Sequence, residues 1–212
     1  MKIDFKKTEK ELYLPKTKPS IIDVPEMTFI TVAGKGDPNN SAEYIAAVQL
    51  LYGLSYTIKM GNKDILDYVV PPLEGLWTVD GDFKGGGATI DDKSKFIWTM
   101  MIRQPDFVTT EIFEAAKITL AKKKPVLDVT KAKIATIDEG LCVQAMHIGP
   151  YDDEAETVVR PDDFAIRNGY ALDINDKRQH HEIYISDPRR TAPERLKTVL
   201  RHPIRRMQSI QK

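Results

Sequence analysis

Three side chains that can do chemistry, His180, Glu182 and Tyr184, occupy alternate positions near the C-terminus. Because side chains alternate between two faces along a β-strand, these three would share one face and the neighbouring isoleucines the other. The isoleucines indicate that the second face packs against the core. In a partly apolar cleft, the Glu182 carboxylate would have a raised pKa or would pair with a cationic or hydrogen-bond-donating ligand. The alternative is an exposed glutamate on a solvated sheet face.

A second carboxylate, Glu74, lies close in sequence to Trp77, and both tryptophans fall in neighbouring predicted strands. Strict alternation would place Glu74 and Trp77 on opposite faces, so we expect a β-bulge at Gly75 that brings them to one face. A flat or cationic ligand would then be held by aromatic walls. We predict an aromatic cage made of Trp77, Trp98, Tyr184 and Tyr151, with core packing as the alternative for each tryptophan.

The remaining candidates predict neither a metal site nor a bound cofactor. The four histidines have no partners at the spacing of a zinc site. His147 either faces the cleft or is buried and hydrogen-bonded, and Cys142, with no base nearby, is expected to be buried and inert. The two glycine-rich segments, 34–36 and 85–87, lack the further residues of a dinucleotide or phosphate loop and are predicted to be turns.

The overall composition restricts the classes of partner. The 212 residues include 31 basic and 31 acidic ones, so no net field favours nucleic acid or an anionic membrane. Seven basic residues between 189 and 206 could touch an anionic partner, but a solvated helix is the favoured interpretation. The sequence has one cysteine, no secretory signal and no run near the roughly 20 apolar residues of a membrane span. We therefore expect a soluble, cytoplasmic protein.

The first half of the chain predicts the order strand, helix, strand, strand. A β-branched strand at 27–33 is followed by a helix that Asn40 would cap and that ends at Gly61-Asn62. Strands are expected at about 67–79 and 95–103, joined by a polar connection. Because prolines 71 and 72 cannot donate to a ladder, the first of these two strands should be an edge strand or start irregularly.

The second half repeats this order after a linking helix at about 109–123. An extra strand at 131–137 is expected to pair with the next one, at 141–148. A helix should begin near Asp153 and be broken or kinked at Pro161, because proline fits a helix interior poorly. A short strand at 181–185 follows, and Thr191 should cap a last helix that runs through Leu200.

These repeats predict a single α+β domain. Two strand-helix-strand-strand modules, about 25–105 and 130–205, would be related by a pseudo-twofold axis within one domain that spans 21–212. They would form a largely antiparallel sheet with helices on one face and a ligand groove on the other. Residues 1–20 form a lysine-rich arm laid over the domain.

The order of short motifs resembles that of a known family. The second half contains 147–151 (HIGPY), 168–170 (NGY), 181–188 (HEIYISDP) and 196–200 (LKTVL), and the first half contains 32–38 (VAGKGDP) and 72–77 (PLEGLW). This combination, from about 20 to 205, resembles the GyrI-like small-molecule-binding domain. The resemblance implies a ligand groove between the two modules. In the family a glutamate on the last strand of the second module meets the ligand, and it aligns with Glu182.

The resemblance also implies two kinds of function. The stand-alone branch of the family includes hydrolases that open the strained ring of DNA-alkylating cyclopropanoid compounds, with an aromatic cage, which here aligns with Trp77, Trp98 and Tyr184. This resemblance implies that Glu182 and Glu74 would be the catalytic carboxylates. The ligand would be a planar aromatic or cationic small molecule. The alternatives are a small-molecule binder or sensor without chemistry, and a protein-binding module similar to the gyrase inhibitors of the family.

Overall fold

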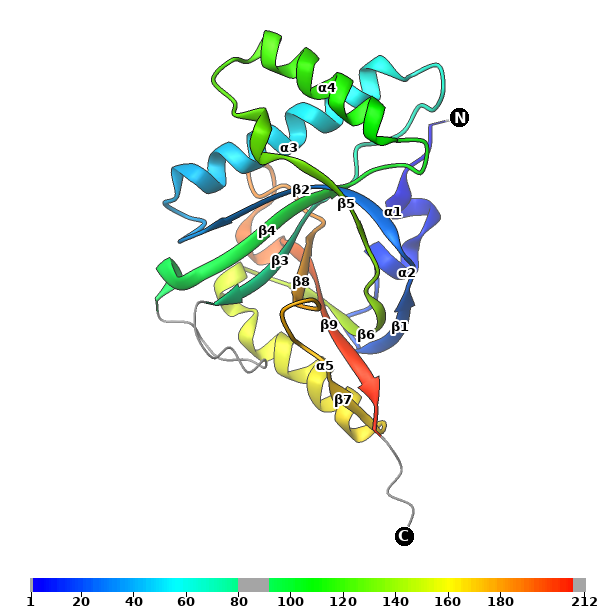
Figure 1. Ribbon diagram of the computed structural model, residues 1–212. Coiled ribbons are helices and arrows are strands. Elements are labelled where there is room, and N and C mark those ends of the chain that lie inside the picture. The colour runs from blue at the N-terminus through cyan, green and yellow to red at the C-terminus, as the bar shows by residue number, and fades with distance from the viewer. Residues whose placement is uncertain (1, 80–91, 208–212) are drawn as a thin grey trace.

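The computed structural model describes residues 2–79 and 92–207 and contains the two expected modules (Figure 1). The first module consists of β2 (Met27–Lys35), α3 (Ala42–Gly61), β3 (Leu73–Val79) and β4 (Phe96–Arg103). The second consists of β6 (Gly140–Ile148), α5 (Ala155–Arg167), β8 (His180–Tyr184) and β9 (Lys197–Arg206). Helix α4 (Thr110–Lys123) links them, with Thr109 as its N-cap. The predicted duplication and the linking helix are confirmed.

One antiparallel sheet unites the two modules. Its strand order is β1-β6-β9-β8-β3-β4-β2-β5, where β1 is Ser20–Val24 and β5 is Lys133–Ile137. The order is symmetric about the β8–β3 junction, which is where the modules meet. The short strand β7 (Tyr170–Leu172) pairs with β9 outside this path.

The two modules exchange their leading strands. Strand β1 precedes the first module but pairs with β6 of the second, and β5 precedes the second but pairs with β2 of the first. The prediction that residues 131–137 pair with the following strand is therefore wrong. Its physical reason is that β1 already occupies the edge of β6, so β5 satisfies its backbone groups on β2 instead.

The sheet curls, and its two faces pack against different partners (Figure 1). Helix α3 lies against the outer face of β2 and β4, and α4 packs on α3. Residues of both modules meet on the inner face, where Phe29 of β2, Cys142 of β6 and Ile183 of β8 belong to one apolar cluster. Helix α5 packs on β6, β7 and β9.

The N-terminal arm is part of the core. It forms two single-turn helices, α1 (Phe5–Thr8) and α2 (Lys10–Tyr13), that lie at the inner face of the sheet. Leu12 and Tyr13 are buried there. An apolar pair so deeply buried stabilises the fold, so the arm is more than the surface covering that the sequence predicted.

The structure departs from two local expectations about helices, a cap at Asn40 and a break at Pro161. Ser41, not Asn40, caps α3, because its hydroxyl accepts the hydrogen bond from the backbone N–H of Tyr44. Helix α5 passes through Pro161 without a break. An interior proline costs about 3 kcal/mol, and the packing of α5 on three strands offsets that cost.

Strand boundaries near the prolines and at the C-terminus also differ from the predictions. Strand β3 begins at Leu73, directly after the two prolines. The prolines, which have no backbone N–H to donate, therefore lie outside the strand, and β3 can occupy a central position instead of an edge. The helix expected from Thr191 is a single 3-10 turn, Pro193–Arg195, and the basic segment after it is strand β9. Tertiary pairing with β6 and β8 outweighs the local capping signal. Glu182 therefore lies on the strand before the last one.

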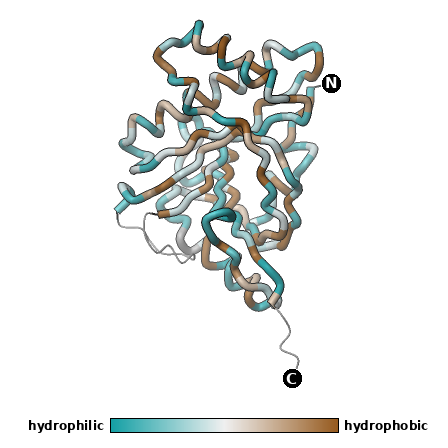
Figure 2. Tube along the Cα trace, viewed as in Figure 1, coloured by the Kyte–Doolittle hydropathy of each residue, from teal (hydrophilic) through white to brown (hydrophobic). Residues whose placement is uncertain are grey.

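The polar connection expected at 80–94, with glycines 85–87, lies almost wholly outside the described residues. No helix among the described residues is long and apolar enough to span a membrane. Hydrophilic residues recur along each long helix in Figure 2, as expected for helices with one solvated side.

Candidate functional site

A cavity of about 1800 Å³ lies on the outer face of the sheet, between α3 and α5. Its floor is the β3–β8 junction, where the two modules meet. Pockets for drug-sized ligands typically occupy about 300–1000 Å³, so this cavity can hold a large organic molecule. The predicted architecture holds except in one respect: the groove shares a face with the helices, because the helices flank the junction and leave it uncovered.

Glu182 lies at the floor of this cavity. Alternation along β8 places His180, Glu182 and Tyr184 on the cavity face and His181 and Ile183 on the inner face, as predicted. The Tyr184 hydroxyl donates to Oε2 of Glu182 at 2.6 Å, and Nε2 of His180 lies 3.0 Å from Oε1. The Glu182 side chain is 16% exposed, so it is held by two partners but still reachable from the cavity.

The hydrogen bonds continue from Glu182 in two directions. The indole N–H of Trp77 donates to the Tyr184 hydroxyl at 3.0 Å. On the other side, Nδ1 of His180 lies 2.6 Å from Nε2 of His202, whose Nδ1 lies 2.6 Å from Oδ1 of Asp162 on α5. The chain thus connects β3, β8, β9 and α5 through side chains alone.

A second carboxyl group in the cavity is Glu154, which the sequence did not single out. It immediately precedes α5, is 8% exposed and lines the cavity with Glu182. Burial raises its pKa well above the ordinary value, and the nearby charge of Glu182 raises it further. Because Glu154 holds its proton more tightly than an ordinary glutamate, the pair can place a proton donor beside an acceptor, the arrangement that acid–base sites use.

Aromatic rings form the walls around these carboxyl groups. Tyr44 of α3 lies 6.2 Å from Trp77, ring centre to ring centre, and Phe96 lies 5.4 Å from Trp77. Tyr151 meets Tyr184 edge to face at 5.6 Å. Trp77, Tyr184 and Tyr151 therefore line this cavity, together with Tyr44 and Phe96, which the sequence did not single out.

Gly75 allows the Trp77 ring to lie close over β3. The register of β3 with β4 is continuous through Gly75, so the expected bulge is wrong. A Cβ atom added at Gly75 would lie 2.6 Å from Nε1 of Trp77. Glycine is thus required for close approach of the indole, which keeps its N–H on Tyr184.

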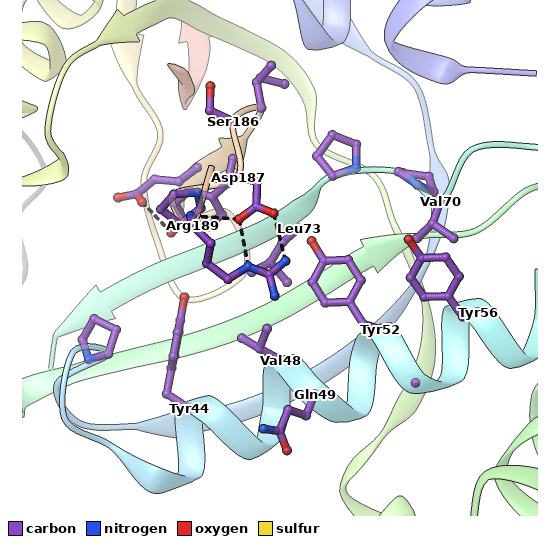
Figure 3. Close-up of a pocket in the computed structure, with 18 of the residues that line it drawn as sticks. Tyr44, Val48, Gln49, Tyr52, Tyr56, Val70, Leu73, Ser186, Asp187 and Arg189 are labelled. Atoms are coloured by element: carbon purple, nitrogen blue, oxygen red, sulfur yellow. Dashed lines mark hydrogen bonds and ion pairs between the residues drawn. The ribbon is translucent and has the colours of Figure 1, made fainter. Parts of the chain in front are cut away.

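The outer part of the cavity runs along α3 (Figure 3). Tyr52 and Tyr56, one turn apart, stack at 6.3 Å. Figure 3 shows Arg189 and Asp187 facing this helix, joined by two hydrogen bonds of 2.9 Å. A flat ligand that fills the floor can therefore extend along an apolar wall with a charged rim.

Glu74 lies on the inner face of the sheet, away from the cavity. Without a bulge, strand alternation turns it opposite to Trp77, and it is 1% exposed. Its Oε2 lies 3.0 Å from Nε2 of His181, whose Nδ1 lies 2.9 Å from Oε1 of Glu139. Arg201 lies 2.9 Å from the other oxygen of Glu139. Glu74 belongs to a buried charge network and not to the cavity lining.

Two other predicted site residues also lie outside the cavity. Trp98 is 1% exposed and packs face-on against Gly34, where an added Cβ atom would lie 2.2 Å from its ring. His147 is buried and hydrogen-bonded to Thr157 and to the Pro150 carbonyl, at 2.8 and 3.0 Å. For both residues the structure shows the core alternative that the sequence left open.

The described residues contain no group of three or more histidine, cysteine or acidic side chains that could hold a metal ion. Cys142 is buried, as predicted, and burial raises its pKa to about 12. A thiol so far from its thiolate form is a poor nucleophile.

The sequence and fold match a known family. The model of the GyrI-like small molecule binding domain matches residues 17–205. This protein belongs to the GyrI-like family. The match covers both modules and the two strands that they exchange, β1 and β5.

Solved structures with the same fold come from Listeria innocua. An uncharacterised conserved protein is 48% identical, with a TM-score of 0.90, over 96% of this chain and 100% of that one. A protein described as a hydrolase is 46% identical, with a TM-score of 0.86, over 96% and 100%. A hydrolase encoded by lin2189 is also 46% identical, with a TM-score of 0.87, over 97% and 100%. No curated protein matches the sequence.

Proposed function

We propose that this GyrI-like protein is a hydrolase that binds planar, electrophilic organic molecules and protects the cell from them. The observation that carries the proposal is the pairing of Glu154 and Glu182 in one aromatic-walled cavity, with the pKa of Glu154 raised by burial and by Glu182. The similar Listeria innocua proteins described as hydrolases support the reaction class. The single buried cysteine fits a cytoplasmic location.

The substrate class is inferred from the shape and the charge of the cavity. Flat aromatic walls favour a planar ligand, and the Glu182 carboxylate favours a cation or a centre that gains positive charge. A strained cyclopropane conjugated to a dienone, as in DNA-alkylating cyclopropanoids, is planar and electrophilic. Such a compound matches both features, and its hydrolysis needs only water and acid–base help.

The proposed step uses both carboxyl groups. Glu182 takes a proton from a water molecule as the water oxygen attacks the exposed cyclopropane carbon. The ring C–C bond breaks, its electron pair moves into the conjugated system, and the resulting phenolate oxygen takes the proton of Glu154. Substrate and water thus give a hydroxyalkyl phenol, and transfer of the proton from Glu182 back to Glu154 restores the site.

The test is turnover of a cyclopropanoid alkylator, followed by mass spectrometry as the gain of one water. Positioned acid–base groups contribute about 10²–10⁴-fold each, so Glu182→Gln and Glu154→Gln should lower kcat by that order. Dye binding should persist in Glu154→Gln. The control is Glu26→Gln, which changes an exposed glutamate outside the cavity.

Three outcomes separate the possibilities. Wild-type turnover that both cavity variants lose supports the proposal. A compound that quenches tryptophan fluorescence and is recovered unchanged would make the protein a binder or sensor. Turnover no faster than in buffer, without binding, would refute the proposed function altogether.

A further inference from the structure

The hydrogen-bonded chain from Glu182 through His180 and His202 to Asp162 needs three hydrogens, one more than its two histidines supply when both are neutral. Its three contacts, Glu182–His180, His180–His202 and His202–Asp162, measure 3.0, 2.6 and 2.6 Å. Each contact at such a distance needs one hydrogen between its two atoms. Two neutral histidines provide two, because each ring carries one N–H. The third must come from a carboxyl group or from an imidazolium.

Burial determines where that third hydrogen can reside. The side chains of His202 and Asp162 are 4% and 8% exposed, and Oδ2 of Asp162 has no partner among the described residues. Burial lowers the pKa of His202, which disfavours an imidazolium at that ring. The third hydrogen can therefore reside on a carboxyl group at either end of the chain, Glu182 or Asp162, or on the His180 ring beside Glu182.

We propose that Asp162, His202 and His180 form a proton relay that lets Glu182 change charge inside the cavity without exchanging a proton with solvent. In one state Asp162 is protonated and Glu182 is a carboxylate. If each of the three hydrogens moves across its own contact, Glu182 becomes neutral and Asp162 becomes the carboxylate. The net change is one proton moved from Asp162 to Glu182, and no ring has to rotate.

The consequence is a cavity that adapts its charge to its ligand. A planar cation stabilises the state with ionised Glu182. A neutral ligand that displaces all water from Glu182 supplies no charge and favours the neutral acid, whereas in the proposed hydrolysis the attacking water stays on Glu182 and keeps it ionised. In that state the carboxyl group also holds the Tyr184 hydroxyl less strongly, so Tyr184 can donate to a ligand carbonyl.

Other ionisable groups face the relay from each neighbouring element. Glu154 and Asp162 come from α5 and its start, and Tyr184 and Glu182 come from β8. Tyr44 faces it from α3, and Tyr151 from the turn before α5. Burial raises the pKa of each of these tyrosines and of Glu154. The raised pKa values favour the neutral forms of these groups, so the relay holds the charge that can move.

Two variants should fix the relay in opposite states. In Asp162→Asn, the amide N–H can donate to Nδ1 of His202, which satisfies every contact with Glu182 ionised. A neutral Glu182 then needs a proton from the buffer. In Glu182→Gln, the cavity group is permanently neutral. The probes are N-methylacridinium and N-methylacridone, which share a shape and differ in charge.

Wild-type protein should bind both dyes with affinities that change little between pH 6.5 and 8. Asp162→Asn should keep N-methylacridinium within about threefold, but should lose affinity for N-methylacridone about tenfold per pH unit, the slope for uptake of one proton. Glu182→Gln should weaken N-methylacridinium by about tenfold or more and keep N-methylacridone. Equal effects of Asp162→Asn on both dyes would overturn the relay.

A measurement on the unliganded protein tests the relay if neither dye binds. In ¹⁵N-histidine spectra, exchange between the two states should give His180 and His202 nitrogen shifts between those of the two tautomers. Asp162→Asn should fix both rings with the proton on Nε2. Identical fixed tautomers in both proteins would refute the proposal.

The relay rests on the proposed function only in taking Glu182 as the ligand-facing carboxylate, and the two can fail separately. Dye selectivity without turnover would leave the relay intact in a binding protein. Turnover without dye selectivity would leave the hydrolase and remove the relay.

Discussion

The two faces of strand β8 carry two clusters of ionisable side chains that differ in charge balance. The inner face holds two acids and two bases, Glu74, Glu139, His181 and Arg201. The cavity face holds three carboxyl groups and two histidines, Glu154, Asp162, Glu182, His180 and His202. Consecutive residues of one strand thus contribute to a closed network on one side and to an open one on the other.

The pKa shifts of the two clusters run in opposite directions. On the inner face, the neighbouring charges of His181 and Arg201 outweigh burial and lower the pKa of Glu139 to about 2. The two glutamates raise the pKa of His181 to about 9 in the same way. On the cavity face, burial raises the pKa of Glu154 and lowers that of His202. Balanced charges stabilise the fold, whereas unbalanced ones leave groups whose protonation a ligand can change.

The largest expected effect comes from breaking the inner network. Arg201 is 1% exposed and hydrogen-bonded to Glu139, to Gln144 and to the Leu12 carbonyl. Arg201→Met would remove one of the two positively charged partners of the buried Glu139 carboxylate. The free energy of unfolding should therefore fall by about 3–5 kcal/mol. Urea denaturation at pH 7 measures this change in the free energy of unfolding.

The matched control is Arg205→Met on the same strand, whose side chain is 60% exposed. It should change the free energy of unfolding by less than about 0.5 kcal/mol. Equal effects of the two substitutions would show that the inner network does not stabilise the fold.

The next effect is a loss of stability at alkaline pH. Because the pKa of His181 rises from 6.5 to about 9 on folding, its stabilisation is fully present below pH 6.5 and is lost as pH rises toward 9. Compared with His181→Gln, the wild-type protein should lose on the order of 3 kcal/mol over that range. Glu139 has the opposite sign, so its contribution is lost as pH falls from 4.5 toward 2.

Urea denaturation of both proteins between pH 5 and 9.5 tests this prediction. Parallel curves for wild type and His181→Gln would mean that His181 is not charged in the folded protein.

A third effect belongs to the cavity face, where a substitution should stabilise the protein instead of destabilising it. The raised pKa of Glu154 means that the folded state binds the proton more tightly than the unfolded state, so stability falls as pH rises above 4.5. Glu154→Gln does not titrate, so it should be more stable than wild type at pH 8, and this advantage should disappear at pH 4, where both proteins are neutral at this position.

Thermal unfolding at the two pH values measures this difference in stability. The control, Glu26→Gln, should leave the stability unchanged at both pH values. A Glu154→Gln protein that is destabilised at pH 8 would place an ionised, paired Glu154 in the cavity and remove the contrast between the two faces.

The sequence predicted those parts of the site that depend on local geometry. Alternation of side chains placed Glu182 and Tyr184 on one face of β8, and the structure confirms it. Alternation also placed Glu74 opposite to Trp77, and the bulge invoked to bring them together does not exist. Glu154 carried no signal of its own, because a glutamate at the start of a helix is common wherever the helix lies.

Long-range pairing decided what local signals could not. The capping pattern at Thr191 predicted a helix, but the segment that follows forms β9, which joins β6 to β8 and brings His202 to His180. Likewise, β5 joins β2 because β1 already covers β6. Such choices depend on which strand edges are free, and no short segment of sequence contains that information.

By itself the sequence determined the duplicated order of elements, the charge-neutral surface and the alternation that presents Glu182. These follow from side-chain type and chain periodicity, which act over a few residues. The tertiary structure alone decided that Glu154 and Glu182 share a cavity, that Glu74 and Trp98 are buried elsewhere, and that two histidines connect Glu182 to Asp162. The pKa of each group depends on burial and on neighbours distant in sequence, and folding brings both together.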